Sequence, residues 1–146
     1  MSRIVGLDYG EKRIGVALSD PTRTIASPHA TLHRRTGKRP PWPELKRIVE
    51  ENDVTEAVIG LPLDLEGVEG EWAAEVREFG AEVERRLGLP VHWMDERLTS
   101  VIAERAVRGM GLKRSQREEK ERVDSAAAAL ILSYHLNRER RNDQVG

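Results

Sequence analysis

Short apolar runs rich in β-branched residues open the chain. The runs Arg3–Asp8 and Arg13–Ser19 flank a short turn, and this arrangement predicts a β-hairpin. A weaker strand pattern covers Thr24–Leu32 and contains Pro28, which cannot donate a backbone hydrogen bond within a sheet. We therefore expect a three-stranded meander whose third strand lies at a sheet edge.

Beyond this meander, apolar strand patterns alternate with helical spacing. Thr55–Leu61 and Val91–Asp95 are short apolar runs of the kind found in buried central strands. Gly80 lies inside the second helical segment and lowers helix propensity by about 1 kcal/mol relative to Ala. The expected helices are Trp42–Val49, Glu71–Leu87 ending at Gly88, residues 100–107 after a cap at Thr99 or Ser100, and residues 115–137, where Ser115 and Glu118 form a capping box.

The resulting order, β-β-β-α-β-α-β-α-α, predicts an α/β fold with a mixed five-stranded sheet and helices on both faces. Ile4–Leu7, Val58–Leu61 and Val91–Met94 are the expected parallel centre. The chain of 146 residues fits one domain, which we expect at residues 1–138, followed by a polar tail at residues 139–146.

Composition narrows the possible chemistry. The chain has no cysteine, which excludes a disulfide framework, a thiolate zinc site and a cysteine nucleophile. No apolar run approaches the ~18 residues of a membrane span, and a strand pattern begins at once without a secretory leader. These features predict a cytoplasmic protein that does not insert into a membrane.

The net charge of −1 is not that of a typical nucleic-acid binder. Basic residues nevertheless cluster, and the acidic excess lies mainly between Glu66 and Glu84, so one face could still bind phosphate. The alternative is that each cluster is an ordinary solvated surface. The basic clusters are Arg34, Arg35, Lys38 and Arg39, and Lys113, Arg114 and Arg117.

Two carboxylates end predicted central strands. Asp8 ends the first strand, and Glu96 follows the last. Ligands of α/β sheets bind at the carboxyl ends of strands, so both residues are candidates for a shared site. Strand alternation places Asp95 and Glu96 on opposite sides, so only one of them is expected to face Asp8. The structural alternatives are a turn-forming Asp8 and a surface ion pair between Glu96 and Arg97.

Asp124 lies more than two turns into the last predicted helix, too deep to act as its cap. It falls at the edge of an apolar stripe, beside Ala128 and Ile131, where a carboxylate is costly unless it is paired with a cation or metal. A buried Asp–Arg pair is the alternative. His135 shares this edge, but it lies ~16 Å further along the helix axis. The expected stripe is Val123, Ala127, Leu130, Ile131 and Tyr134.

Asp8, Glu96 and Asp124 could converge on one point. Their donors are hard oxygens without thiolates, and this donor set favours Mg²⁺ or Mn²⁺ over Zn²⁺. Such a site suits phosphoryl transfer, in which divalent ions stabilise the attacking and leaving oxygens. The residues therefore predict a metal-dependent enzyme that acts on a phosphate ester.

Four motifs, in order, resemble the YqgF/RuvX family over nearly the whole chain. They are Gly6-Leu7-Asp8-Tyr9-Gly10 continuing into Lys12-Arg13-Ile14-Gly15-Val16-Ala17, then Gly60-Leu61-Pro62-Leu63, Asp95-Glu96-Arg97-Leu98-Thr99, and Val123-Asp124-Ser125-Ala126-Ala127-Ala128. One departure is Asp64-Leu65-Glu66-Gly67, where the family usually has Asn first, which adds a charge near the expected site. Another is Glu118, Glu119 and Glu121, which dilute a stretch that is usually more basic.

The resemblance implies an RNase H-like nuclease associated with maturation of the 5′ end of pre-16S rRNA, leaving 5′-phosphate and 3′-hydroxyl products. Asp8, Glu96 and Asp124 match the family's acidic triad. Residues in or beside the family motifs could contact nucleic-acid phosphates, and ribosomal particles are possible partners of a monomer or homodimer. These candidate contacts are Lys12, Arg97, Thr99, Lys113, Arg114 and Arg117.

Three other functions stay open at this stage. A Holliday junction resolvase would use the same carboxylates but should act as a symmetric dimer on branched DNA. The opening hairpin also resembles that of actin-like ATPases and sugar kinases, which need a second domain that this length does not provide. A non-catalytic nucleic-acid-binding module is disfavoured by three carboxylates that would repel phosphate without a metal.

Overall fold

The computed structural model describes residues 2–34, 39–98 and 116–145, with side chains in the last range described from Arg122 to Arg141. The helix expected at residues 100–107 and the capping residue Ser115 lie outside the described residues. Elsewhere the expected elements form in the expected order. The strands are β1 (Arg3–Tyr9), β2 (Arg13–Ser19), β3 (Ala26–His33), β4 (Val54–Leu61) and β5 (Val91–Asp95).

The five strands form one mixed sheet in the order β3-β2-β1-β4-β5. The first three strands pair antiparallel as a meander, and β1, β4 and β5 pair in parallel, which confirms the predicted parallel centre. Strand β3 lies at an edge of the sheet, as Pro28 predicted. It begins two residues later than expected. Asp20 accepts backbone hydrogen bonds from Thr24 and Ile25, and these bonds keep both residues in the preceding turn.

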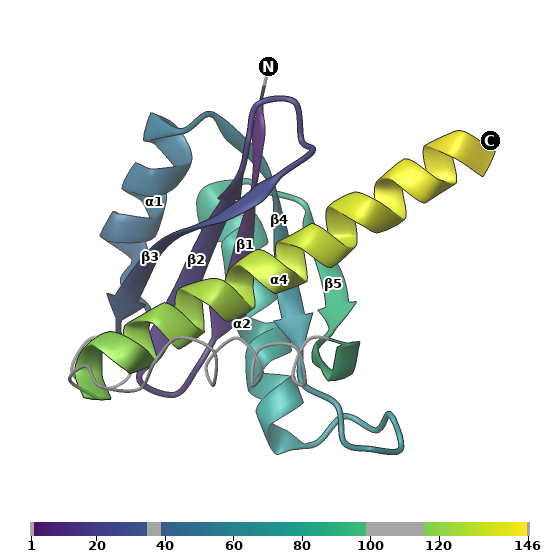
Figure 1. The fold of residues 1–146 in the computed structure, drawn as a ribbon. Helices are drawn as coiled ribbons and strands as arrows, with labels where there is room; N and C mark the ends of the chain where they lie inside the picture. Colours follow the sequence, from purple (N-terminus) through teal and green to yellow (C-terminus); the bar gives the residue numbers. More distant parts are fainter. Residues whose placement is uncertain (1, 35–38, 99–115, 146) are drawn as a thin grey trace.

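Helices cover both faces of the sheet. Helices α1 (Trp42–Glu51) and α2 (Glu71–Leu87) lie behind the sheet in Figure 1, and α4 (Gln116–Val145) crosses its front. Strand alternation divides β1 between two cores: Val5 and Leu7 pack toward α1 and α2, and Ile4 packs toward α4. The fold class predicted from the order of elements is confirmed.

Helix α2 shows why a glycine is tolerated inside a helix. A Cβ at Gly80 would lie 2.5 Å from the Trp93 ring, so the glycine lets the helix approach the sheet. The helix ends at Gly88, whose φ of +68° is the left-handed conformation of a helix C-cap, as predicted. The tryptophans are half-buried against this core.

Helix α4 differs from the prediction in two respects. It continues to Val145 instead of ending near Asn137, because the Arg-rich segment that follows Asn137 has good helix propensity even where it leaves the sheet (Figure 1). Its buried face is also rotated, and of the predicted stripe only Ile131 is fully buried. The buried residues of this helix are Ala128, Ile131, Leu132, His135 and Leu136. Within the described ranges, no helix is both long and apolar enough to cross a membrane.

Three strand glycines allow α4 to lie directly on the sheet. A Cβ at Gly6 would lie 2.8 Å from the Ala128 carbonyl oxygen, and one at Gly60 would lie 2.6 Å from Ile131 Cδ1. At Gly15 the backbone carbonyl of Asp124 occupies the space a Cβ would need. The sequence thus places Asp124 against β2, directly beside β1.

Candidate active site

Asp8 is the penultimate residue of β1, and its side chain faces α4. Its neighbours Leu7 and Tyr9 pack on the opposite side of the sheet, against α1 and α2. In the sheet register Asp8 pairs with Gly15, the residue on which α4 rests. The carboxylate is therefore enclosed between the sheet and the helix.

Glu96 begins η1 (Glu96–Leu98), a 3₁₀ turn that follows directly on β5. Its side chain folds back over Gly60, where a Cβ would lie 2.7 Å from Glu96 Oε1. Asp95 instead forms a hydrogen-bonded ion pair with Arg97, at 2.6 Å. The expected separation of the two acids is observed, and the partner of the Arg97 guanidinium is Asp95.

Electrostatics show that Asp8 and Glu96 face each other. Burial raises the pKa of Asp8 well above its ordinary value, and the negative charge of Glu96, a hydrogen bond to Glu96 and the charge of Asp124 raise it further. The pKa of Glu96 is also raised, chiefly by burial, although the hydrogen bond with Asp8 opposes that shift. A divalent cation held between these two carboxylates would relieve their mutual repulsion.

Asp124 reaches the same region from α4, but its carboxylate is turned toward Arg13. Arg13 Nε donates to Asp124 Oδ2 at 2.7 Å, with both side chains about three-quarters buried. This is the Asp–Arg pair that stood as the alternative to metal ligation. The sequence analysis gave Arg13 no role, although strand alternation from Gly15 would have placed it on the face that meets α4.

The three candidate ligands are thus neighbours without forming a closed cluster. Asp8 and Glu96 hydrogen-bond to each other, and Asp124 is engaged by Arg13. With the side chains in these positions, no three acidic, His or Cys side chains of the described ranges form a group that could hold an ion. His135, on the same face of α4, lies near Glu139 and His92, far from this site.

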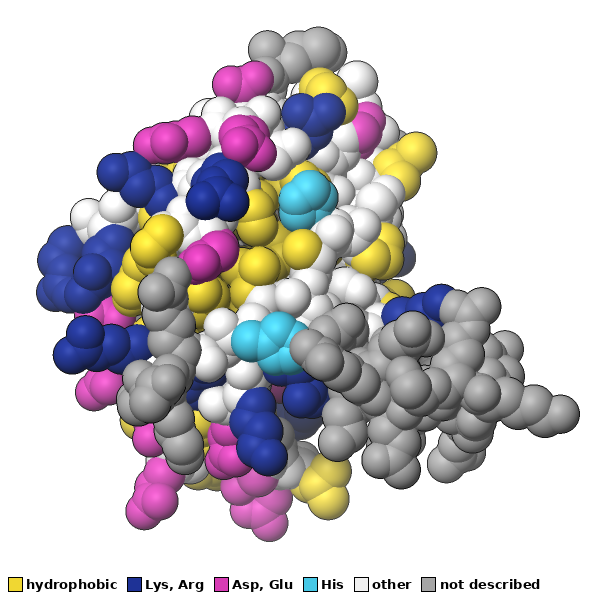
Figure 2. Space-filling view, turned by 90° about the vertical axis from the view of Figure 1, so that its left-hand side faces the viewer, with side chains coloured by type: hydrophobic (Ala, Val, Ile, Leu, Met, Phe, Trp, Pro, Cys, Tyr) yellow, Lys and Arg dark blue, Asp and Glu magenta, His cyan; other side chains and the backbone are white. Residues whose placement is uncertain are grey.

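Two of the candidate phosphate contacts are described in full. Lys12 is exposed in the turn between β1 and β2, next to the carboxyl end of β1, and Arg97 is exposed beside Glu96. Arg117 lies in the first turn of α4. Thr99, Lys113 and Arg114 lie outside the described residues. Figure 2, which faces the side of β3 and α1, shows Lys and Arg gathered at its left margin and Asp and Glu toward its upper and lower ends.

The loop after β4 also lies near this site. Asp64 Oδ1 accepts backbone hydrogen bonds from Glu66 and Val68, both at 2.9 Å, so the aspartate fills the role of turn former. The Arg97 guanidinium lies against this turn, with Nη1 3.4 Å from the Leu65 carbonyl oxygen. An Asn side chain has the same acceptor oxygen, so this turn does not depend on the added charge.

Comparison with known proteins identifies the family. A family model described as "RuvX: Holliday junction resolvase" matches residues 2–138. The chain belongs to the RuvX family. A relative from Maridesulfovibrio salexigens is 40% identical over 136 residues, covering 93% of this chain and 98% of its own length. A second, from Anaplasma marginale, is 42% identical over 135 residues, covering 92% and 84%. Both are named "Putative pre-16S rRNA nuclease".

Solved structures place the RuvX-family chain in a wider fold class. Thermus thermophilus RuvC superposes with a TM-score of 0.54 at 14% identity, covering 94% of this chain and 96% of that one. The same protein in complex with a Holliday junction superposes with a TM-score of 0.53 at 14% identity, covering 96% of each chain. The fold is therefore RNase H-like, as the sequence motifs implied.

Proposed function

We propose that this protein is a divalent-metal-dependent nuclease that hydrolyses phosphodiester bonds in the 5′ leader of pre-16S rRNA. The observation that carries the proposal is the enclosed, hydrogen-bonded pair Asp8 and Glu96, with Asp124 brought beside them by α4. Membership of the RuvX family and the printed names of the two relatives support the choice of reaction and substrate.

The donor chemistry of this group fits Mg²⁺ or Mn²⁺. Asp8 and Glu96 present hard oxygens whose mutual repulsion a dication would relieve, and Asp124 would join them on leaving Arg13. When bound, the metal would supply Lewis-acid activation of water and stabilisation of charge at the scissile phosphate.

The remaining residues act on the substrate and on Asp124. Lys12 and Arg97 lie on two sides of the sheet edge formed by the carboxyl ends of the parallel strands. They would hold phosphates of the nucleic-acid backbone, so the affinity for nucleic acid should depend on salt. Arg13 holds the Asp124 carboxylate while no metal competes for it. Once Asp124 turns away, the Arg13 guanidinium becomes available to a phosphate oxygen at the same edge.

Purified protein with labelled pre-16S leader RNA tests the proposal, in Mg²⁺, in Mn²⁺ and in EDTA. Asp8→Asn and Asp124→Asn should each lower the cleavage rate about a thousandfold, because each removes several kcal/mol of transition-state stabilisation. Asp53→Asn is the matched control. Asp53 is exposed at the opposite end of the sheet with φ of +51°, a conformation that Asn also adopts readily. RNA cleavage that survives in either site variant, or in EDTA, would contradict the proposal.

A second candidate, cleavage of branched DNA, is favoured by the description of the matching family model and by the RuvC fold. A synthetic four-way DNA junction, assayed beside the RNA, separates the two. Symmetric nicking of the junction by a dimer, with the RNA intact, would show that the same carboxylates serve a Holliday junction resolvase. RNA binding without cleavage of either substrate would favour the non-catalytic module.

A further inference from the structure

A cavity of about 380 Å³ opens on the side of the sheet that faces away from Asp8. It lies between the end of β1, the turn that joins β1 to β2, the segment between β3 and α1, and helix α2. Its lining residues are Tyr9, Glu11, Arg34, Pro40, Trp72, Glu75, Glu78, Phe79 and Glu82. The proposed nuclease function uses none of them.

The floor of this cavity is a row of stacked aromatic rings. The Tyr9 ring lies 5.5 Å from the Trp72 ring and 4.2 Å from the Phe79 ring, in both cases nearly parallel. Stacked rings present electron-rich faces that attract cations. Arg34 shows this preference within the chain, since its guanidinium carbon lies 4.6 Å from the centre of the Tyr9 ring.

The rim of the cavity is acidic. Four carboxylates face a single guanidinium, that of Arg34, giving the lining a net charge of −3. Glu75, Glu78 and Glu82 act together on Tyr9 and, after burial, are among the causes of its raised pKa. Within the described part of the chain, Glu11, Glu75 and Glu78 have no ion-pair partner, whereas Glu82 pairs with Arg85 and Arg86.

Tyr9 supplies an independent indication of a ligand. Its side chain lines the cavity although the residue is only 8% exposed. Among the described residues its hydroxyl has no hydrogen-bond partner. The hydroxyl is not a fully buried atom, so it is open to a ligand or water in the cavity. Arg34 covers the Tyr9 ring and Phe79 is buried, so the cavity offers the half-buried Trp72 ring, a phenolic hydroxyl and unpaired carboxylates to one occupant.

We propose that this cavity binds an arginine side chain from a basic segment of a partner protein. A guanidinium stacks on aromatic rings as a plane and also donates to carboxylates at its edge, and both groups are present here. The same rim would repel a phosphate backbone, so nucleic acid is excluded as the occupant. The inference does not depend on the proposed nuclease activity, because the two sites lie on opposite faces of the sheet.

NMR titration of the full chain with three short Gly-Ser peptides tests the proposal. The peptides carry one arginine, one lysine or one citrulline, the uncharged analogue of arginine. Trp72 lines the cavity, whereas Trp42 and Trp93 do not, so their indole N–H resonances are an internal reference. The arginine peptide should shift the Trp72 resonance saturably, the lysine peptide should bind more weakly, and the citrulline peptide should leave it unchanged.

Charge removal gives the decisive comparison. Glu75→Gln with Glu78→Gln should raise the dissociation constant of the arginine peptide about tenfold, because two charge-assisted contacts are lost. Glu50→Gln with Glu51→Gln removes the same charge from the exposed end of α1 and should leave it unchanged. Tyr9→Phe keeps the ring and should weaken binding less than the double variant.

Three results would overturn the proposal. Equal binding of the arginine and citrulline peptides would show that charge plays no part. Equal weakening by the two double variants would show only general attraction to an acidic protein. If a short RNA oligonucleotide displaced the arginine peptide and reversed its effect on the Trp72 resonance, the cavity would be assigned to nucleic acid.

Discussion

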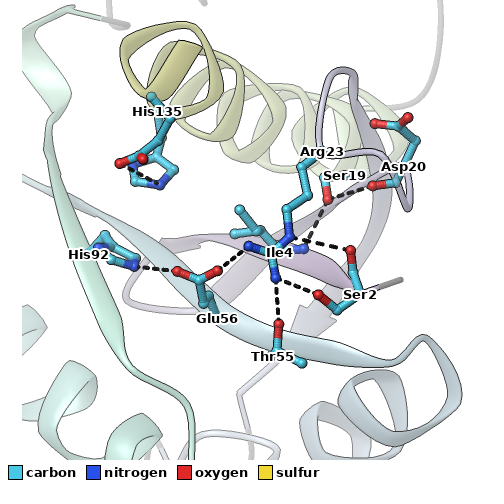
Figure 3. Close-up of polar contacts among 10 residues, drawn as sticks. Ser2, Ile4, Ser19, Asp20, Arg23, Thr55, Glu56, His92 and His135 are labelled. Carbon is cyan, nitrogen blue, oxygen red and sulfur yellow. Dashed lines mark hydrogen bonds and ion pairs between the residues drawn. The ribbon is translucent and has the colours of Figure 1, made fainter. Parts of the chain in front are cut away.

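The carboxylates at the two ends of the central sheet have opposite electrostatic surroundings. At the amino ends of β4 and β5, Glu56 lies between Arg23, at 2.5 Å, and His92, at 2.8 Å, while Arg23 also binds Ser2 and Thr55 (Figure 3). At the carboxyl ends, Asp8 faces another carboxylate, Glu96. One end uses charge to join elements. The other end brings carboxylates of like charge together. This arrangement lowers the stability of the fold, but it is what a metal site requires.

The pKa shifts follow the same division. Burial raises the pKa of Glu56, but the His92 hydrogen bond and the charge of Arg23 outweigh it, so the pKa lies below its ordinary value. The pKa of Asp8 is raised, because burial and the neighbouring carboxylates Glu96 and Asp124 all act in the same direction. Substitutions at the two ends should therefore change the free energy of unfolding in opposite directions.

The largest expected effect is at Gly15. This glycine lets α4 rest on β2 and so brings Asp124 to the candidate active site. Gly15→Ala would place a methyl group where the Asp124 carbonyl lies, and we expect a loss of about 3 kcal/mol in the free energy of unfolding. Urea unfolding measures it. Gly70→Ala is the control, because a Cβ there meets nothing within 4 Å. Equal effects of the two substitutions would mean that α4 does not rest on β2.

At the paired end, Glu56→Gln should lower the free energy of unfolding by about 2 kcal/mol at pH 7, because Arg23 loses its charged partner. The lowered pKa of Glu56 means that its stabilisation is present above 4.5, the ordinary value, and is lost as the pH falls through the folded-state pKa. The difference between wild type and variant, measured by denaturant unfolding, should therefore shrink in acid. A difference that persists unchanged at pH 3 would argue against the ion pair.

At the candidate active site, Asp8→Asn should raise the free energy of unfolding by about 1 kcal/mol at neutral pH, since it removes like-charge repulsion. A raised folded-state pKa gives stability below 3.8, the ordinary value, that is lost as the pH rises through the folded-state pKa. The gain of the variant over wild type should therefore be larger at pH 8 than at pH 4. A loss of stability at pH 8 would show that the Asp8–Glu96 contact is a net stabilising one.

Sequence predicted the arrangement of this site better than its detailed contacts. The order of elements, the parallel centre and the separation of Asp95 from Glu96 follow from hydrophobic period and strand alternation, which are local properties. The rotation of α4 did not follow, because Ala-rich helix faces differ little in hydrophobicity. Its orientation is set by the glycines of strands distant in sequence. The length of α4 was underestimated for a related reason: a polar end without an apolar face can continue as helix.

Arg13 forms an ion pair with Asp124, so this carboxylate resembles the paired Glu56 rather than its neighbour Asp8. Arg13→Gln should lower the free energy of unfolding by somewhat under 1 kcal/mol in EDTA, since the pair is partly exposed. In saturating Mg²⁺ the loss should shrink, because metal binding stabilises the folded state and takes Asp124 from the arginine. Thermal unfolding with and without Mg²⁺ measures both. A loss that is equal in the two conditions would mean that Asp124 stays with Arg13 when metal is present.

The smallest expected effect concerns Asp64, in the loop after β4 near the candidate active site. Asp64→Asn keeps the oxygen that accepts the Glu66 and Val68 N–H groups, so the free energy of unfolding should change by less than about 0.5 kcal/mol. Asp64→Ala removes that acceptor and should cost about 1 kcal/mol. If the edge binds phosphate, Asn should also tighten RNA binding slightly, measured by fluorescence anisotropy at low salt, because one negative charge is gone. Tighter binding that persists in high salt would instead indicate a direct contact by the amide, and binding weakened by Asn would place the RNA elsewhere on the molecule.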